Sequence, residues 1–192
     1  MIELKCLGDI GVIGGYNSKN CEYFSNNKKK KEWKNMPDLN YIRESPSCCV
    51  LNEKNIFCFF GYDNALNKYN DSIEKISLEE KNKKWEEIKP LGMKKNMERK
   101  GASCLVYNNK EKDYIFIVGG INNVENETKD ILIYNNIENK IERKKNRLPF
   151  KCSFNQNSFN LLCNGFYCNF DINSSLIQYE QLGEVFFTLG GN

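Results

Sequence analysis

The sequence predicts an all-β fold built from small antiparallel sheets that repeat along the chain. Runs of β-branched and aromatic residues that stop at glycine recur, as in IFCFFG and YIFIVGG. Apolar and polar residues alternate in segments such as DILIY and KWEEI, which is the period of a half-buried strand. The segment SLEEKNKKWEEI has helix-forming composition, but it coincides with the register of the repeat, so we expect strands there as well.

Length and charge narrow the class of protein. The 192 residues suffice for one domain with a substantial core. The 28 basic and 25 acidic residues leave a net charge of +3, and the lysine run 28–31 is followed at once by Glu32, so we expect no nucleic-acid partner. The apolar runs are too short to cross a membrane, and the first residues carry charges that a signal peptide lacks. We therefore expect a cytoplasmic protein.

The residue types that bind metals or act as nucleophiles also narrow the class of protein. The absence of histidine excludes a Ser-His-Asp or Cys-His nucleophile and any imidazole metal site. Several of the nine cysteines lie inside apolar runs, where a thiol behaves as a small buried hydrophobe, which favours a reduced chain. The alternative is a cysteine-only zinc site using Cys163 and Cys168, whose C-x4-C spacing is loose. We expect no metal and no cofactor.

The glycine stops define the repeat. Each ends a continuously apolar run, and after the first three come a polar loop, a second β-type run and a turn that leads to Trp or a bulky aliphatic residue. Leu78 to Trp85, Tyr134 to Ile141 and Phe170 to Ile177 are each seven positions apart. Each period thus predicts four short strands. The stops lie at Gly14-Gly15, Gly61, Gly119-Gly120 and Gly190-Gly191.

A period of roughly 50 residues with four strands and a glycine pair resembles the kelch family. The glycine pairs match its double glycine, with Phe60-Gly61 a degenerate copy. Tyr134, with Tyr23, Leu78 and Phe170, falls near the aromatic residue of the third strand, while Trp33 and Trp85 match the tryptophan that Ile141 and Ile177 replace later. Such sheets cannot bury both faces alone, so the resemblance implies that they stack around an axis as the blades of a β-propeller.

The whole chain, 1–192, is expected to form one kelch-repeat domain of about four blades. The expected blades span 1–37, 45–91, 101–149 and 150–182, and residues 184–192 begin a further blade. The fourth repeat departs from the pattern, because a tight Asn164-Gly165 turn replaces the glycine pair and its loop. Propellers have four to eight blades, so we expect an incomplete ring: a segment of a longer protein, a small irregular ring, or a ring completed by self-association.

The glycine pairs themselves are expected to be structural. A phosphate-binding loop needs a helix directly after the glycines, and INNVENETKD predicts a loop instead. We therefore expect these glycines to serve strand ends that need positive φ or close backbone approach. Trp33 and Trp85 are expected to pack between blades, with an exposed ligand platform as the alternative.

Cationic and hydroxyl residues ahead of the small-residue strands are the candidate binding residues. In kelch propellers this place opens toward the central channel, so the resemblance implies a ring that faces a partner; the alternative is solvated or blade-bridging charge. The loops after the glycines, with Tyr16, Tyr62, Asn64 and Asn122, are the expected variable surface. The members of the expected ring are Arg43, Ser45, Arg99, Ser103, Lys151 and Ser153.

The function expected from these features is protein binding, as a scaffold or substrate adaptor, without catalysis. One alternative is a propeller enzyme that modifies sugars through a carboxylate such as Glu98 or Asp63, since the copper oxidases of this fold need histidine. Another is the regulatory part of a larger enzyme, because kelch repeats occur beside phosphatase domains. The sequence does not identify the partner.

Overall fold

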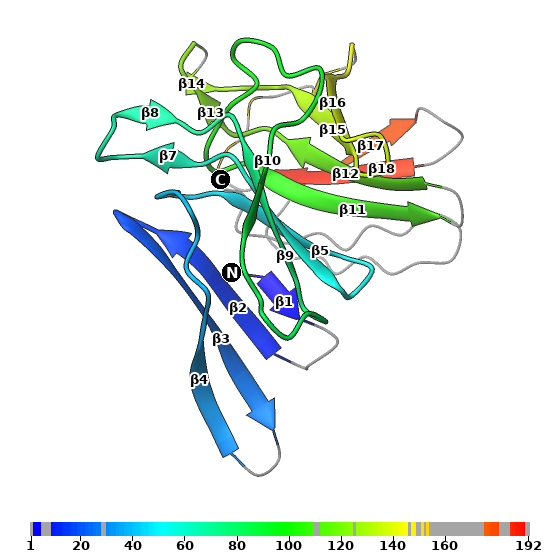
Figure 1. The fold of residues 1–192 in the computed structure, drawn as a ribbon. Helices are drawn as coiled ribbons and strands as arrows, with labels where there is room; N and C mark the ends of the chain where they lie inside the picture. Colours follow the sequence, from blue (N-terminus) through cyan, green and yellow to red (C-terminus); the bar gives the residue numbers. More distant parts are fainter. Residues whose placement is uncertain are drawn as a thin grey trace.

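The computed structural model describes residues 2–4, 9–27, 30–109, 112–124, 126–145, 147–148, 151, 153, 175–180 and 185–190. Every regular element in these residues is a β-strand (Figure 1). The segment 77–88, which has helix-forming composition, contains no helix: one strand ends at Ser77 and another spans Glu86–Ile88. Among the described residues there is also no helix of the length and apolarity needed to span a membrane.

Three four-stranded antiparallel sheets follow one another along the chain, and each is a meander in which neighbours in sequence pair in space, apart from small hairpins that project from two of them. They lie within the expected ranges 1–37, 45–91 and 101–149. The first sheet contains β1 (Ile2–Leu4), β2 (Asp9–Gly15), β3 (Ser18–Asn27) and β4 (Lys30–Met36). The second contains β5 (Ser47–Leu51), β6 (Asn55–Phe59), β9 (Ile73–Ser77) and β10 (Glu86–Ile88). The third contains β11 (Ser103–Asn109), β12 (Lys112–Val118), β15 (Ile131–Asn135) and β16 (Lys140–Arg143).

The three sheets differ in the connection between their second and third strands. In the first sheet it is a tight turn at Tyr16 and Asn17. In the second sheet a hairpin projects, β7 (Tyr62–Asp63) paired with β8 (Lys68–Tyr69). The third sheet has a matching hairpin of β13 (Ile121–Asn122) and β14 (Asn126–Glu127). Figure 1 shows both hairpins at the same side of the molecule.

The strand registers align the three sheets residue by residue. Trp33 lies opposite Phe24, and Ile141 lies opposite Tyr134. Glu86 pairs with Lys75, which places the preceding residue, Trp85, opposite Ile76. Trp33, Trp85 and Ile141 therefore occupy equivalent positions. The expected alignment of Leu78 with Tyr134 is wrong, because β9 ends at Ser77 and the turn before Trp85 is two residues longer than the seven-residue spacing implies.

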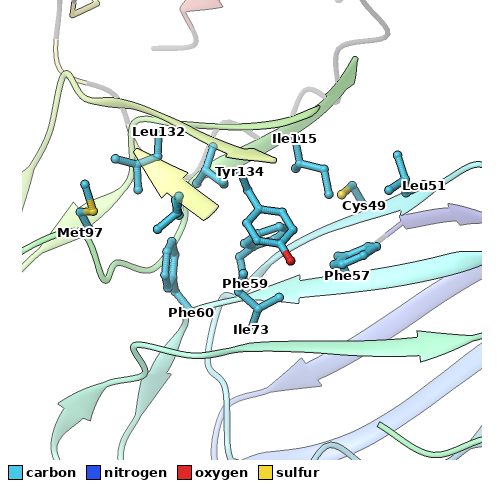
Figure 2. Packing of buried hydrophobic residues seen from close by; sticks show 12 residues of the cluster. Cys49, Leu51, Phe57, Phe59, Phe60, Ile73, Met97, Ile115, Leu132 and Tyr134 are labelled. Carbon is cyan, nitrogen blue, oxygen red and sulfur yellow. The ribbon is translucent and has the colours of Figure 1, made fainter. Parts of the chain in front are cut away.

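The first strands of the sheets lie side by side, with β5 against both β1 and β11. Between the second and third sheets lies the larger core, in which Phe57 and Phe59 of β6 contact the ring of Tyr134 on β15 with centroids 6.0 and 5.5 Å apart (Figure 2). Residues 56–59 are buried on both faces, as expected for the continuously apolar strand before the glycine stop. The Phe59–Tyr134 contact is edge-to-face, a geometry that stabilises the fold beyond the effect of the area that the rings bury.

A second core joins the first and second sheets. It contains Ile13 and Cys21 from the first sheet and Ile56, Ile76 and Trp85 from the second. The other face of the first sheet is open, since Ile10, Val12 and Trp33 are 41%, 37% and 51% exposed. Trp85 thus packs between sheets as expected, whereas Trp33 does not.

The last described strands form a separate hairpin. β17 (Ser175–Glu180) pairs with β18 (Val185–Gly190) over six residue pairs. The boundary expected between a fourth blade ending at 182 and a new one starting at 184 lies outside the described residues, and the segments on either side of it, β17 and β18, pair in one sheet. The rest of the expected fourth blade, including Phe170 and the Asn164-Gly165 turn, lies outside the described residues.

Candidate interaction surface

Arg43 lies in the connection between the first and second sheets, and its side chain is fully buried. Its Nε donates to Oε1 of Glu74 at 2.8 Å. Its Nη1 donates to the carbonyls of Phe60 and Ser72, and its Nη2 donates to the hydroxyl of Ser72. Glu74 is equally buried and accepts two backbone N–H groups from the same connection. Arg43 and Glu74 thus form a one-to-one ion pair whose hydrogen bonds are all made. Buried charges are tolerated in proteins when they are paired and hydrogen-bonded in this way.

Arg99 holds the same place before the third sheet and is also fully buried. Its Nη1 donates to the carbonyl of Gly119 at 2.8 Å, as Arg43 does to Phe60, and its Nε donates to Met97. Its counter-ion is Asp130, the residue before β15, at 3.5 Å from Nη2. Burial lowers the pKa of Arg99 to about 10, and the charge of Asp130 opposes that shift.

These contacts correct the expectation that Arg43 and Arg99 face a partner. Both guanidinium groups point into the protein and hold the end of the second strand against the start of the third strand in their own sheets. Of the remaining members of the expected ring, Ser45, Ser103 and Ser153 are half-buried and Lys151 is exposed. The hydroxyl of Ser153 donates to Glu127.

The glycine stops have the structural role that the sequence predicts. Gly14, Gly119 and Gly120 have φ of 63°, 67° and 96°, and the degenerate copy reproduces this with Phe60 at 56° and Gly61 at 90°. A Cβ on Gly14 would lie 2.7 Å from the carbonyl oxygen of Arg43. The N–H of the next residue, Gly15, donates to that oxygen, as Gly61 does to Arg99. The Gly14-Gly15 and Phe60-Gly61 stops therefore each attach the end of one sheet to the connection that enters the next. Gly190 lies in β18, and Gly191 is outside the described residues.

Apolar side chains project from the loops between the second and third strands. Tyr16 is 75% exposed in the turn of the first sheet. Leu66 is 61% exposed at the tip of the β7–β8 hairpin, and Val124 is 65% exposed at the tip of the β13–β14 hairpin. All three follow the glycine end of a second strand, so they lie at corresponding ends of successive sheets. We call these three residues the loop tips.

Polar side chains fix the two hairpins below their tips. Oδ1 of Asp63 accepts the N–H groups of Ala65 and Leu66 at 2.9 and 3.0 Å. Oδ1 of Asn122 accepts the N–H of Val124 at 2.9 Å. The carboxylate of Asp63, proposed from the sequence as a catalytic group, therefore caps a turn.

Tyr62, which was expected at the variable surface, also packs against residues that hold the base of the β7–β8 hairpin. Its half-buried ring contacts Tyr69 edge-on with centroids 4.9 Å apart, and Nζ of Lys100 lies 4.9 Å from the ring centre. Lys100 also forms an ion pair with Glu44 at 3.0 Å. A hydrogen bond from Asn64 and the charge of Lys100 lower the pKa of Glu44. These contacts couple the base of the β7–β8 hairpin to the entry of the third sheet.

The described cysteines are free and line the interior where the sheets meet. Burial raises the pKa of Cys21 to about 12, and it raises the pKa of Cys58 and Cys104 well above the ordinary value. Such thiols are poor nucleophiles. Within the described ranges no three cysteine or carboxylate side chains are grouped as metal ligands would be. Cys163 and Cys168, the loose zinc pair of the sequence, lie outside those ranges.

Comparison with known proteins adds no relative. The sequence matches no family model, and it matches no curated protein.

Proposed function

We propose that the chain is a protein-binding module of the kelch-propeller type that holds its partner at the loop tips. The observation that carries this proposal is the exposure of Tyr16, Leu66 and Val124 at corresponding ends of three successive sheets. Isolated exposed apolar residues are ordinary, but three in corresponding loops of successive sheets form a set. Loops held by a rigid scaffold are where binding residues concentrate in proteins.

The arrangement of the sheets supports the propeller part of the proposal. Four-stranded meanders follow one another, their first strands are neighbours, and the faces of adjacent sheets pack together. Each of these features is expected of blades around an axis. In the second and third sheets, the residues equivalent to those on the open face of the first sheet are covered by a neighbouring sheet. We therefore include self-association through this open face in the proposal.

The test compares two ends of the same sheets. In the loop-tip variant Tyr16, Leu66 and Val124 are replaced by serine. In the control, Ile137→Ser, the changed residue is 68% exposed and lies in the turn between β15 and β16, at the opposite end of the third sheet. Proteins bound to each variant are cross-linked and quantified against the wild type.

We expect at least one partner protein to bind both the wild type and Ile137→Ser but not the loop-tip variant. Retention of every partner by the loop-tip variant contradicts it. So does equal loss in Ile137→Ser, because that would indicate general stickiness of exposed apolar residues.

A further inference from the structure

Two thiols face each other inside the second sheet. Cys48 on β5 and Cys58 on β6 are direct cross-strand partners in the register of these strands. Opposite residues of an antiparallel pair project to the same face. Cys58 belongs to the core that joins the first and second sheets, Cys48 packs against that core, and a hydrogen bond connects the two side chains. We call Cys48 and Cys58 the thiol pair.

The backbone hydrogen bonds show how closely the strands approach at the thiol pair. The N–H of Leu78 donates to the carbonyl of Lys54, and that of Phe60 donates to the carbonyl of Ser72. These two bonds flank the pairing of β6 with β9, in which hydrogen-bonded and non-hydrogen-bonded pairs alternate, so the N–H and C=O of Cys58 point toward β9. The thiol pair is therefore a non-hydrogen-bonded pair of β5 and β6. In such pairs the Cα atoms lie about 4.5 Å apart, within the range of roughly 4.4–6.8 Å that a disulfide spans.

The two thiols differ in their access to solvent. Cys48 is half-buried, whereas Cys58 is fully buried. Burial raises the pKa of Cys58 well above its ordinary value, and the hydrogen bond with Cys48 adds to that rise. Cys58 therefore stays a protonated thiol behind its partner, and a small oxidant that arrives from solvent reaches Cys48 first.

The third sheet shows that the fold does not require a thiol at both positions. Cys104 of β11 lies opposite Ile117 of β12. Ile117 and Cys58 are equivalent, because each lies two residues before the glycine stop of its own sheet. An aliphatic side chain thus occupies this position in the third sheet, so packing alone does not explain the second thiol of the pair.

Cys49, the next residue along β5, is directed away from the thiol pair. Its side chain projects to the opposite face of the strand, into the larger core between the second and third sheets (Figure 2). There it forms a hydrogen bond with Cys104. Cys49 and Cys104 belong to different sheets, so the register of paired strands does not hold them opposite each other as it holds the thiol pair.

We propose that the thiol pair is a redox-active site that a peroxide converts to a cross-strand disulfide. The Cys48 sulfur attacks hydrogen peroxide, the O–O bond breaks, and a sulfenic acid and one water result. The Cys58 sulfur then attacks the sulfenic sulfur. The S–S bond forms as the S–O bond breaks, and the thiol proton leaves in a second water, so the peroxide is reduced as the two cysteines are oxidised.

Contact between the two side chains makes the second step feasible. A buried protonated thiol is a poor nucleophile toward molecules in solution, but the reaction with Cys48 is intramolecular and has a high effective concentration. The disulfide fastens β6 to β5, the strand that contacts both neighbouring sheets. Oxidation therefore stabilises the second sheet at the place where the three sheets meet.

The experiment treats the reduced full chain with hydrogen peroxide, blocks free thiols with N-ethylmaleimide in denaturant, and maps tryptic peptides without reduction. Trypsin releases Cys48 and Cys49 in peptide 44–54 and Cys58 in peptide 55–68. The wild type should yield these two peptides joined by a link that dithiothreitol reverses. Cys48→Ser and Cys58→Ala should each lose the link. Cys49→Ala is the matched control, because it removes the neighbouring thiol on the opposite face, and it should keep the link.

A second readout is thermal stability. A disulfide between residues 48 and 58 constrains the unfolded chain, so the oxidised wild type should melt several degrees above the reduced form, and Cys48→Ser should show no such rise. The proposal is overturned if the folded wild type yields no link between 44–54 and 55–68, or if Cys49→Ala loses that link. A link from 44–54 to the Cys104 peptide, 101–110, in its place would assign oxidation to the other core. The loop-tip variant should oxidise as the wild type does, so failure here leaves the protein-binding proposal standing.

Discussion

Replacing Trp85 by alanine should destabilise the protein far more than the same change at Trp33, although the two residues share one position in the repeat. Trp85 is 4% exposed, packs against the first sheet, and donates from Nε1 to the carbonyl of Pro37 at 2.8 Å. Truncating a buried Trp to Ala costs about 3–5 kcal/mol. Trp33 is 51% exposed and has one ring contact, with Phe24 at 5.5 Å. That contact and partial burial predict a cost below about 1.5 kcal/mol.

Urea unfolding followed by far-ultraviolet circular dichroism measures both costs. Fluorescence is unsuitable, because each variant removes one of only two tryptophans. Trp85→Phe serves as a control that keeps most of the packing but loses the hydrogen bond, and it should fall between the wild type and Trp85→Ala. Equal losses for Trp33→Ala and Trp85→Ala would refute the assignment of one to the interior and the other to an open face.

Three further predictions concern charge and backbone conformation. Glu74→Gln leaves Arg43 as an uncompensated buried cation and should cost about 3–5 kcal/mol in urea unfolding, whereas Glu87→Gln, whose carboxylate accepts from Tyr41 at the surface, should cost far less; similar costs would contradict the buried pair. The pKa of Glu44 lies below its ordinary value of 4.5 in the folded state, so its contribution to stability is present above that pH and is lost as the pH falls through the lower folded value. Melting temperatures measured across this acid range should therefore fall less steeply for Glu44→Gln than for the wild type, and identical slopes would argue against the Asn64 and Lys100 contacts. Gly14→Ala should cost more than about 1 kcal/mol, because φ is 63° and the new Cβ would meet the carbonyl of Arg43; unchanged stability would show that this approach is not close.

Local chemistry explains why much of the strand pattern could be predicted. Glycine ends the second strands because it adopts positive φ and allows close backbone approach at little cost in free energy. Phe60, with positive φ, is an exception that tertiary packing tolerates. Asparagine has a similar role in the turns: six of the nine non-glycine residues with positive φ in the described ranges are asparagines.

Register was harder to predict, because the turn length between paired strands varies. Leu78 and Trp85 have the same spacing as Tyr134 and Ile141, but a longer turn places Ile76 opposite Trp85. The segments on either side of the expected boundary at 182–184, β17 and β18, pair in one sheet, and such pairing depends on which strand is nearby in space, which composition does not report.

The sequence alone determined the strands and their glycine ends, since these follow from residue-level preferences for φ and for alternating burial. It could not distinguish Trp33 from Trp85, because burial depends on whether a neighbouring sheet covers the face. Nor could it show that Arg43 and Arg99 point inward, since their counter-ions, Glu74 and Asp130, are 31 positions away in the chain and meet them only after the sheet has folded. Tertiary structure decides these cases because solvation and charge pairing are set by distance in space, to which spacing along the chain is a poor guide.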